Sequence, residues 1–297
     1  MTEPDLRRTE PSPLQVDMRL FGELVRGNPL YVFSLVLVIL YLAYSSIVLM
    51  YPAVIPYNPT SINLVAALVP PSSSYPFGTD ELGRNLILRV LYGAPLDAEV
   101  AVAVGLFGFA IGMLMGSIAG YFGGFIDQTI MRITDIFLAF PGLVLAVAVA
   151  AALGPGLMNA LIAMAVVWWP VYTRIARGET LSVKEQQFVL AAKASGVSRI
   201  KIVTSHILSN VAAPTIAYAT SDIGNIMITF SVLGYLGLGA QPPYADLGRI
   251  VYDGQPFVRF APWYALLPGI TLFAIVLSFT FVGDLIRDFL DPRLRRI

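Results

Sequence analysis

Long stretches without a charged residue constrain this chain more than any other feature. Three of them occupy residues 27–79, 100–126 and 136–173. A helix needs about 20 apolar residues to cross the hydrocarbon core of a bilayer. Charged residues make up only 13% of the chain, which is about half the usual share of a soluble domain. The sequence therefore predicts an all-α integral membrane protein.

The apolar stretches divide into about six predicted membrane-spanning helices. The third stretch is too long for one helix and divides at Gly154-Pro155-Gly156, which is a turn signal. Further apolar runs follow in the second half of the chain. The predicted spans are, in order, 30–50, 100–126, 136–153, 157–173, 208–238 and 260–283.

The distribution of Lys and Arg predicts the orientation of the chain. With the N-terminus inside, the inner segments hold fifteen of the nineteen Lys and Arg residues and the outer segments hold four. Basic residues near span ends are enriched on the cytoplasmic side, so both termini are predicted to be cytoplasmic. The first apolar run is long and no small-x-small cleavage site follows it. We therefore interpret it as an anchor that stays and not as a signal peptide.

These assignments divide the chain into five parts. They are a cytoplasmic N-terminal tail (1–29), a first transmembrane helix (30–51), an extracellular segment (52–96), a transmembrane core (97–288) and a cytoplasmic C-terminal tail (289–297). In the extracellular segment, Thr79 is expected to cap a helix that lies on the outer membrane surface. Its apolar side chains would be Leu82, Leu86, Val90 and Tyr92. A second long outer loop, 239–262, is expected to dock a partner or to cover the mouth of a pathway.

Residue types exclude several kinds of chemistry. The chain has no Cys and one His, which excludes disulfides, thiolate chemistry and a cage of histidines around a metal. Its net charge of zero gives no argument for nucleic acid as a partner. None of its three Lys residues follows a Gly, so the nucleotide-binding loop G-x-x-x-x-G-K-[ST] is absent. We predict no catalytic residue, metal site or cofactor in this chain.

Two features inside the predicted spans have structural and functional interpretations. Gly112, Gly116 and Gly120 share one helix face, a pattern that lets helices approach closely in lipid; packing within the chain is preferred to a dimer face. Asp222 lies well inside a span, where ionisable groups are costly and often functional. Either it bonds to Asn225 or a neighbouring helix, or Asp222 and Asn225 line a polar pathway.

A short basic segment, AAKASGVSRIKIVTSHILSN, interrupts the apolar runs. It is amphipathic and is interpreted as two short helices that meet at Gly196, where glycine permits a positive φ. Ala191 and Ala192 keep the first helix thin, and Ser198 is expected to cap the second helix, which carries Arg199. Such a pair of helices is suited to a groove on another protein. The alternative is a solvated loop.

The same region resembles a known family. FVLAAKASGVSRIKIVTSHILSNVAAP is similar to the cytoplasmic coupling loop of ATP-binding-cassette (ABC) importer permeases, and most similar to the C-type permease subunit of dipeptide and oligopeptide importers. Four other segments agree in order: FGTDELGRN, YFGGFIDQTIMRITDIFLAFPGL, YLGLGAQPP and GDLIRDFLDPRLR. The resemblance covers about residues 75–295. It departs from the family pattern at Asn85, Pro95, Leu190 and Ser209, and Leu190 stands where the family often has a Glu that could contact the ATPase.

The resemblance implies a type I ABC importer permease bundle. Its coupling loop would span about residues 185–206, with Ala191, Ala192, Gly196, Ser198, Arg199, His206 and Leu208 as the ATPase-coupling residues. The chain would form half of a pathway for peptides, or for a related solute such as oligosaccharides or nickel, and would work by alternating access.

The partners implied by the resemblance are a homologous second permease in a heterodimer, two ABC ATPase subunits that hold ATP and Mg²⁺, an extracellular solute-binding protein and membrane lipid. The location implied is a prokaryotic plasma membrane. From the residues alone, an ion-coupled secondary transporter that uses Asp222 stays open as the alternative.

Overall fold

A computed structural model describes residues 21–56, 58 and 60–290. Much of the predicted N-terminal tail, and the C-terminal tail from residue 291, lie outside the described residues. Within them the chain is helical, and a single bridge joins Thr79 to Asn85. The main helices are α2 (Pro29–Met50), α3 (Leu86–Phe122), α4 (Gly124–Leu138), α5 (Gly142–Leu153), α6 (Leu157–Val183), α7 (Gln187–Ala194), α8 (Arg199–Ile202), α9 (Leu208–Tyr235), α10 (Leu247–Gly254) and α11 (Trp263–Leu290). Short 3₁₀ turns are η1 (Pro52–Val54), η2 (Leu64–Ala66) and η4 (Gln255–Phe257), and η3 (Val203–Ile207) is a π-helical turn.

Four helical stretches in the described part of the chain are long and apolar enough to cross a membrane. They are α2, α3, the continuous run Arg199–Tyr235 and α11, and the bent pair α4–α5 would make a fifth. Helix α6 has 27 residues, which is long enough to cross a membrane. Its polar residues lower its hydropathy, so it is not among these candidate spans. The all-α membrane architecture is therefore confirmed, while the count of six spans stays a prediction.

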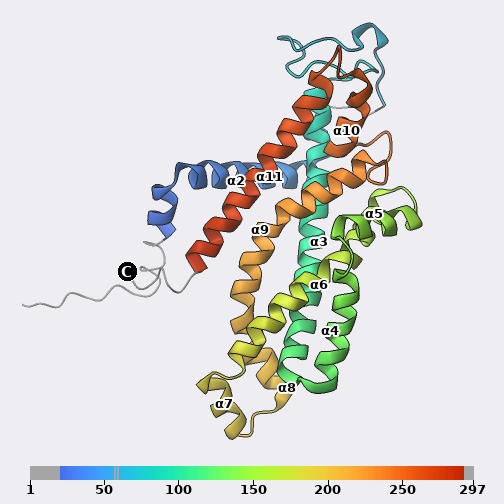
Figure 1. The fold of residues 1–297 in the computed structure, drawn as a ribbon. Helices are drawn as coiled ribbons and strands as arrows, with labels where there is room; N and C mark the ends of the chain where they lie inside the picture. Colours follow the sequence, from blue (N-terminus) through green and yellow to red (C-terminus); the bar gives the residue numbers. More distant parts are fainter. Residues whose placement is uncertain (1–20, 57, 59, 291–297) are drawn as a thin grey trace, which may run out of the picture.

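The long helices place two groups of connecting segments at opposite ends of the molecule. Figure 1 shows α3 running along the length of the fold, with the segment before it and α10 toward one end and α7 and α8 at the other. The hydroxyl of Tyr31 donates to a carboxylate oxygen of Asp288 at 3.0 Å, and the rings of Phe21 and Phe289 pack edge to face. The first and last described segments therefore lie side by side.

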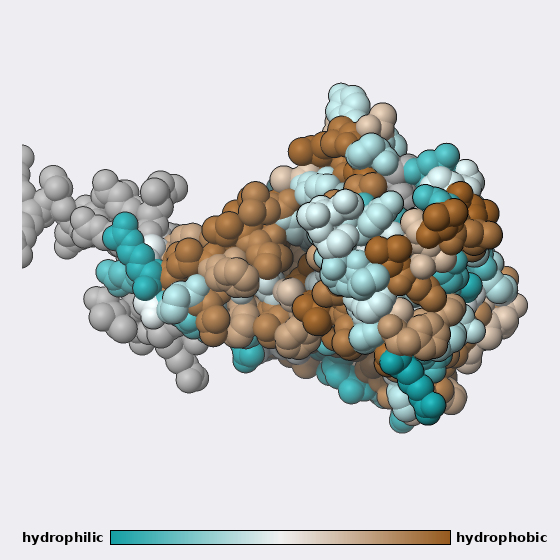
Figure 2. All heavy atoms as spheres, turned by 90° about the horizontal axis from the view of Figure 1, so that it is seen from above, coloured by the Kyte–Doolittle hydropathy of each residue, from teal (hydrophilic) through white to brown (hydrophobic). Residues whose placement is uncertain are grey.

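Apolar side chains are exposed along the flanks of the bundle. Helix α2 alone exposes Phe33, Leu40 and Met50 by 62%, 64% and 70%. Figure 2, which looks along the molecule from the end that carries α10, shows hydrophobic surface over much of one flank. Exposed apolar surface on this scale is expected where helices face lipid.

The predicted third span, 136–153, is not a single helix. Helices α4 and α5 meet at an angle of 85°, and Pro141 lies at the break. Proline lacks a backbone N–H and clashes with the preceding turn, which favours a bend or a break at this position. The predicted boundary at residues 154–156 is confirmed, because α5 ends at Leu153 and α6 begins at Leu157.

The outer surface helix predicted to start at Thr79 is also wrong. Helix α3 begins at Leu86, and the side chain of Asn85 caps it by accepting from the backbone N–H of Ile87 at 3.1 Å. Leu86 and Val90 are 0% and 2% exposed, so they belong to the core and not to a surface face. The Thr79 hydroxyl donates instead to the carbonyl of Ala66. Helix α3 includes Pro95 and continues unbroken for 37 residues.

The glycine stripe of α3 packs directly against α6. A Cβ atom added to Gly112 would lie 2.3 Å from the Cβ of Tyr172, and one added to Gly116 would lie 2.4 Å from the carbonyl oxygen of Thr173. At Gly120 the same atom would lie 2.8 Å from the Cβ of Thr180. All three separations are shorter than van der Waals contact, so only glycine fits this helix interface.

We expect Gly116→Ala to destabilise the purified protein in detergent by about 1–3 kcal/mol, because the added methyl group would force α3 away from α6. Gly178→Ala is the matched control, because no heavy atom lies within 4 Å of its added Cβ. Alanine is the better helix former by about 0.5–1 kcal/mol, so the control should melt at the same or a higher temperature. Equal melting temperatures for the two variants would contradict the close α3–α6 contact.

Candidate functional site

The basic segment folds as two short helices that project from one end of the bundle. We call residues 187–207, which comprise α7, α8 and η3, the knob. Its turn is at Gly196, where φ is +75°, and the N–H of Val197 donates back to the carbonyl of Ala192 at 3.1 Å. The Ser198 side chain caps α8 by accepting from the N–H of Lys201 at 3.4 Å. The predicted helix pair and its turn are therefore confirmed.

The knob rests on a small core of its own. Val189, Ile202 and Ile207 are at most 1% exposed and pack with Val183 of α6 and Val211 of α9. These contacts fix the knob to the ends of two long helices. A force applied to the knob would therefore reach α6 and α9 directly.

A polar contact also fixes the start of the knob. The Lys184 ammonium donates to the carbonyl of Gly120 at 3.0 Å, near the end of α3. Cations are favourable at a helix C-terminus, where backbone carbonyls lack partners. The connection from α6 to the knob is therefore anchored to α3.

The outward face of the knob carries large apolar side chains. Leu190 and Ile200 are 45% and 73% exposed, and Phe188 is 39% exposed. Exposed apolar side chains on a projecting element such as the knob are available for contact with a partner. From the sequence, Leu190 is recognised only as a departure from the family pattern, and Ile200 is not distinguished from the other apolar residues of the segment.

The seven predicted coupling residues all fall on or beside the knob. Ala191, Gly196, Ser198 and Arg199 are exposed, and Ala192 packs partly against the core of the knob. The His206 ring lies 6.2 Å from the Phe188 ring. Leu208 begins α9, immediately after the knob.

Asp222 is enclosed by donors from two helices. Its carboxylate accepts from Trp168 Nε1 at 2.6 Å, from the Tyr172 hydroxyl at 3.1 Å and from the side-chain amide of Asn225 at 3.1 Å. Asp222 is only 5% exposed. These contacts match the interpretation in which it bonds to Asn225 and a neighbouring helix.

The opposite end of the bundle holds a buried ion network that sequence reasoning missed. Arg89 is 4% exposed, and its guanidinium donates to Asp80 at 3.2 Å and to the Tyr264 hydroxyl at 2.8 Å. It also pairs with Asp253 of α10. From the sequence, Arg89 counts only as one of the four basic residues of the outer segments. The pairing with Asp253 joins residues 164 positions apart, and no local pattern signals such a contact.

Helix α10 is also held to α3 at its other end. The Asp97 carboxylate accepts from the N–H of Leu247 at 3.1 Å. Asp246 caps α10 by accepting from the N–H of Arg249 at 2.8 Å, and it accepts from Ala240 at 3.0 Å. Burial raises the pKa of Asp246 to about 6. The hydrogen bonds of these two carboxylates therefore hold the start of α10 to α3 and to the loop before α10.

With this geometry the chain can be compared with known proteins. The family described as binding-protein-dependent transport system inner membrane component matches residues 112–296. The chain belongs to this family. It is 42% identical over 270 residues to the probable D,D-dipeptide transport system permease protein DdpC of Escherichia coli strain K12, covering 91% of this chain and 90% of that protein. It is 34% identical over 240 residues to the nickel transport system permease protein NikC of the same strain, covering 81% and 87%.

A solved structure has a similar fold. A chain of the MetNI methionine ABC transporter in an inward-facing conformation superposes with a TM-score of 0.58 at 21% identity, covering 69% of this chain and 97% of that one. Family and fold together confirm the predicted importer permease class and the inner-membrane location. The protein is therefore a transport subunit and not an enzyme.

The two ends of the bundle should differ in access from outside the cell. The chain has no Cys, and Ser73 and Ser195 are both exposed, so single cysteines can report on each end. With the predicted orientation, Ser73→Cys should react with a membrane-impermeant maleimide in intact spheroplasts, whereas Ser195→Cys should react only after permeabilisation. Labelling of residue 195 from outside would reverse the orientation.

Proposed function

We propose that this chain forms half of the translocation pathway of an ATP-driven importer. A homologous second permease completes the pathway, two ABC ATPase subunits that bind ATP and Mg²⁺ dock on the cytoplasmic knobs, and an extracellular solute-binding protein delivers the solute. This chain needs no cofactor of its own.

The observation that carries the proposal is the knob. The apolar side chains of Leu190 and Ile200 are exposed on the knob. The buried residues at the base of the knob pack on α6 and α9. The exposed face supplies contact area for a partner, and the short side chain of Ala191 allows a close approach. When ATP binding closes the ATPase pair, a docked knob moves with it. The base passes that movement to α6 and α9, and the two bundles re-orient between outward and inward access.

We propose short peptides as the solute class. The relative named for D,D-dipeptide transport is more similar to this chain, and over more of its length, than the relative named for nickel. In such importers the binding protein contributes the selectivity, so the permease requires only a pathway of suitable width and polarity.

An ion-coupled transporter that uses Asp222 is the less favoured function. Three donors already surround this carboxylate, and such bonds are sufficient to keep a carboxylate inside a helix bundle. Family membership gives this alternative no support.

Asp222→Asn should therefore leave energy coupling unchanged. The amide keeps one acceptor oxygen for the Trp168 N–H, so the loss should be about one hydrogen bond, or about 1 kcal/mol of stability. Uptake of a radiolabelled dipeptide by the complete transporter should persist in the presence of a proton uncoupler, for wild type and variant alike. Uncoupler-sensitive uptake in wild type that is lost in Asp222→Asn would favour the alternative.

Gly196→Leu should weaken ATPase retention. The side chain costs about 1 kcal/mol at positive φ, and it projects from the knob because no atom lies within 4 Å of its Cβ. It would therefore meet the docked partner. We expect normal expression, reduced co-purification of the ATPase subunits and ATP hydrolysis that no longer drives uptake.

Gly154→Leu is the control for the backbone cost alone. Gly154 has a φ of +89° and open space around its Cβ, and it lies between α5 and α6, outside the knob. This variant should retain its ATPase subunits. If Gly196→Leu holds its ATPases and transports like wild type, the knob is not the docking site.

A further inference from the structure

A pocket separates the knob from the end of α3. It encloses about 490 Å³ and lies between the last turn of α3 and the two helices of the knob. Its lining residues are Tyr121, Phe122, Lys193, Val197, Arg199 and Ile202. The exposed apolar residues Leu190 and Ile200 do not line it, whereas Arg199, one of the predicted coupling residues, does.

The charge in the pocket is entirely positive. Lys193 and Arg199 are its two charged lining residues, and neither forms an ion pair with any residue that the structure describes. The Lys193 ammonium lies 5.4 Å from the centre of the Tyr121 ring, an attraction that holds the cation over the ring face. Two unpaired cations beside an aromatic ring form a site for an anion.

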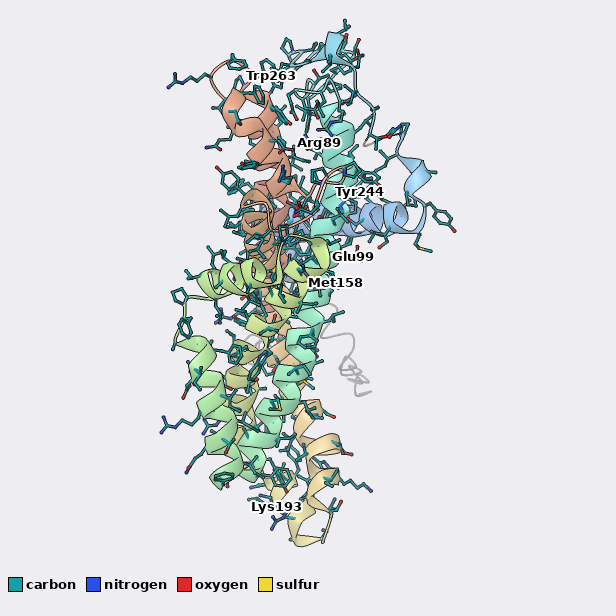
Figure 3. All side chains as sticks on the ribbon, turned by 90° about the vertical axis from the view of Figure 1, so that its right-hand side faces the viewer. Arg89, Glu99, Met158, Lys193, Tyr244 and Trp263 are labelled. Carbon is teal, nitrogen blue, oxygen red and sulfur yellow. The ribbon has the colours of Figure 1, made fainter. Side chains whose placement is uncertain are left out.

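The position of the pocket indicates which anion it receives. Tyr121 and Phe122 end the apolar run of α3, and Tyr is enriched where transmembrane helices meet the lipid headgroups. Beyond them, Phe125 and Ile126 of α4 are 83% and 43% exposed. Figure 3 shows Lys193 near the knob end of the molecule, far from Arg89 and Trp263 at the opposite end. Phe122, which lines the pocket, is 37% exposed, so cations and exposed apolar surface meet at one place and match both parts of a phospholipid.

We propose that this pocket binds the phosphate of an anionic phospholipid headgroup. Lys193 and Arg199 contact the phosphate, and the acyl chains lie along the exposed apolar surface at the start of α4. Basic pockets between helices at the membrane surface bind headgroups in this way. Because the pocket includes residues of both α3 and the knob, a bound lipid would connect the membrane surface to the element proposed to receive the ATPase.

The test uses the complete transporter, delipidated in detergent and titrated with phosphatidylglycerol, with bound lipid counted by native mass spectrometry. Lys193→Gln should weaken phosphatidylglycerol binding about fivefold, which corresponds to one basic residue at a membrane surface. Lys193→Arg should restore it. Lys201→Gln is the matched control, because Lys201 is an exposed cation of α8 that does not line the pocket, and its affinity should equal that of wild type. Inorganic phosphate at equal concentration should not displace the lipid.

Three results would overturn the proposal. Equal weakening by Lys193→Gln and Lys201→Gln would indicate general attraction to a basic surface and no defined site. Displacement of the lipid by inorganic phosphate would indicate a site for the free anion. If Lys193→Gln leaves lipid binding unchanged but reduces co-purification of the ATPase subunits, the pocket receives an acidic side chain of the ATPase.

Discussion

The direct contact between the backbones of α3 and α6 determines where the rest of the molecule can lie. Lipid tails are as apolar as the side chains they surround, so helix association in a bilayer depends on van der Waals contact and on polar bonds. The glycines at 112, 116 and 120 remove the side chains that would separate the two helices. Helix α6 then continues to Val183, which is part of the base of the knob. The position of the knob is thus set several turns away, within the bundle.

Ion pairs hold together the end of the bundle that carries α10. Arg84, Arg89 and Arg249 lie with Asp80, Glu81 and Asp253 in one network, so positive and negative side chains are equal in number. Burying such groups is costly unless every charge is paired. A network of this kind therefore tolerates few alternative arrangements, and it fixes α10 and the start of α11 on α3. Small residues hold one end of α3, and ion pairs hold the other.

The sequence was informative wherever a local pattern has one physical cause. Apolar runs located the long helices, Gly154-Pro155-Gly156 located a turn, and Gly196 with Ser198 located the two helices of the knob. Prediction was wrong where a local signal met a stronger tertiary one. Thr79-Asp80-Glu81 has the composition of a helix start, but these side chains bond to Ala66, Arg84 and Tyr264 instead. The Asp222 partners from α6 and the buried environment of Arg89 depend on helices that are far apart in the sequence, so no spacing rule could identify them.

Under the proposed function, movement of the knob has to reach the outer end through two different helices. The knob continues through η3 into α9 without a break, and π-helical turns of this type are frequent at functional positions. Helix α9 is tied to its neighbours by side-chain bonds, from Ser231 to Asp97 at 3.2 Å and from Tyr172 to Asp222 at 3.1 Å. Helix α3 is joined to α6 by backbone contact, and α9 has similar contacts: a Cβ atom added to Gly283 of α11 would lie 2.3 Å from the Cα of Ser221, and one added to Gly248 of α10 would lie 1.8 Å from the carbonyl oxygen of Ser231. A glycine interface of this kind cannot slide without a clash, so each helix pair joined in this way moves together. Because the base of the knob packs on both α6 and α9, and glycine contacts join these helices to α3, α10 and α11, movement of the knob would reach the outer end through the packed bundle as a whole.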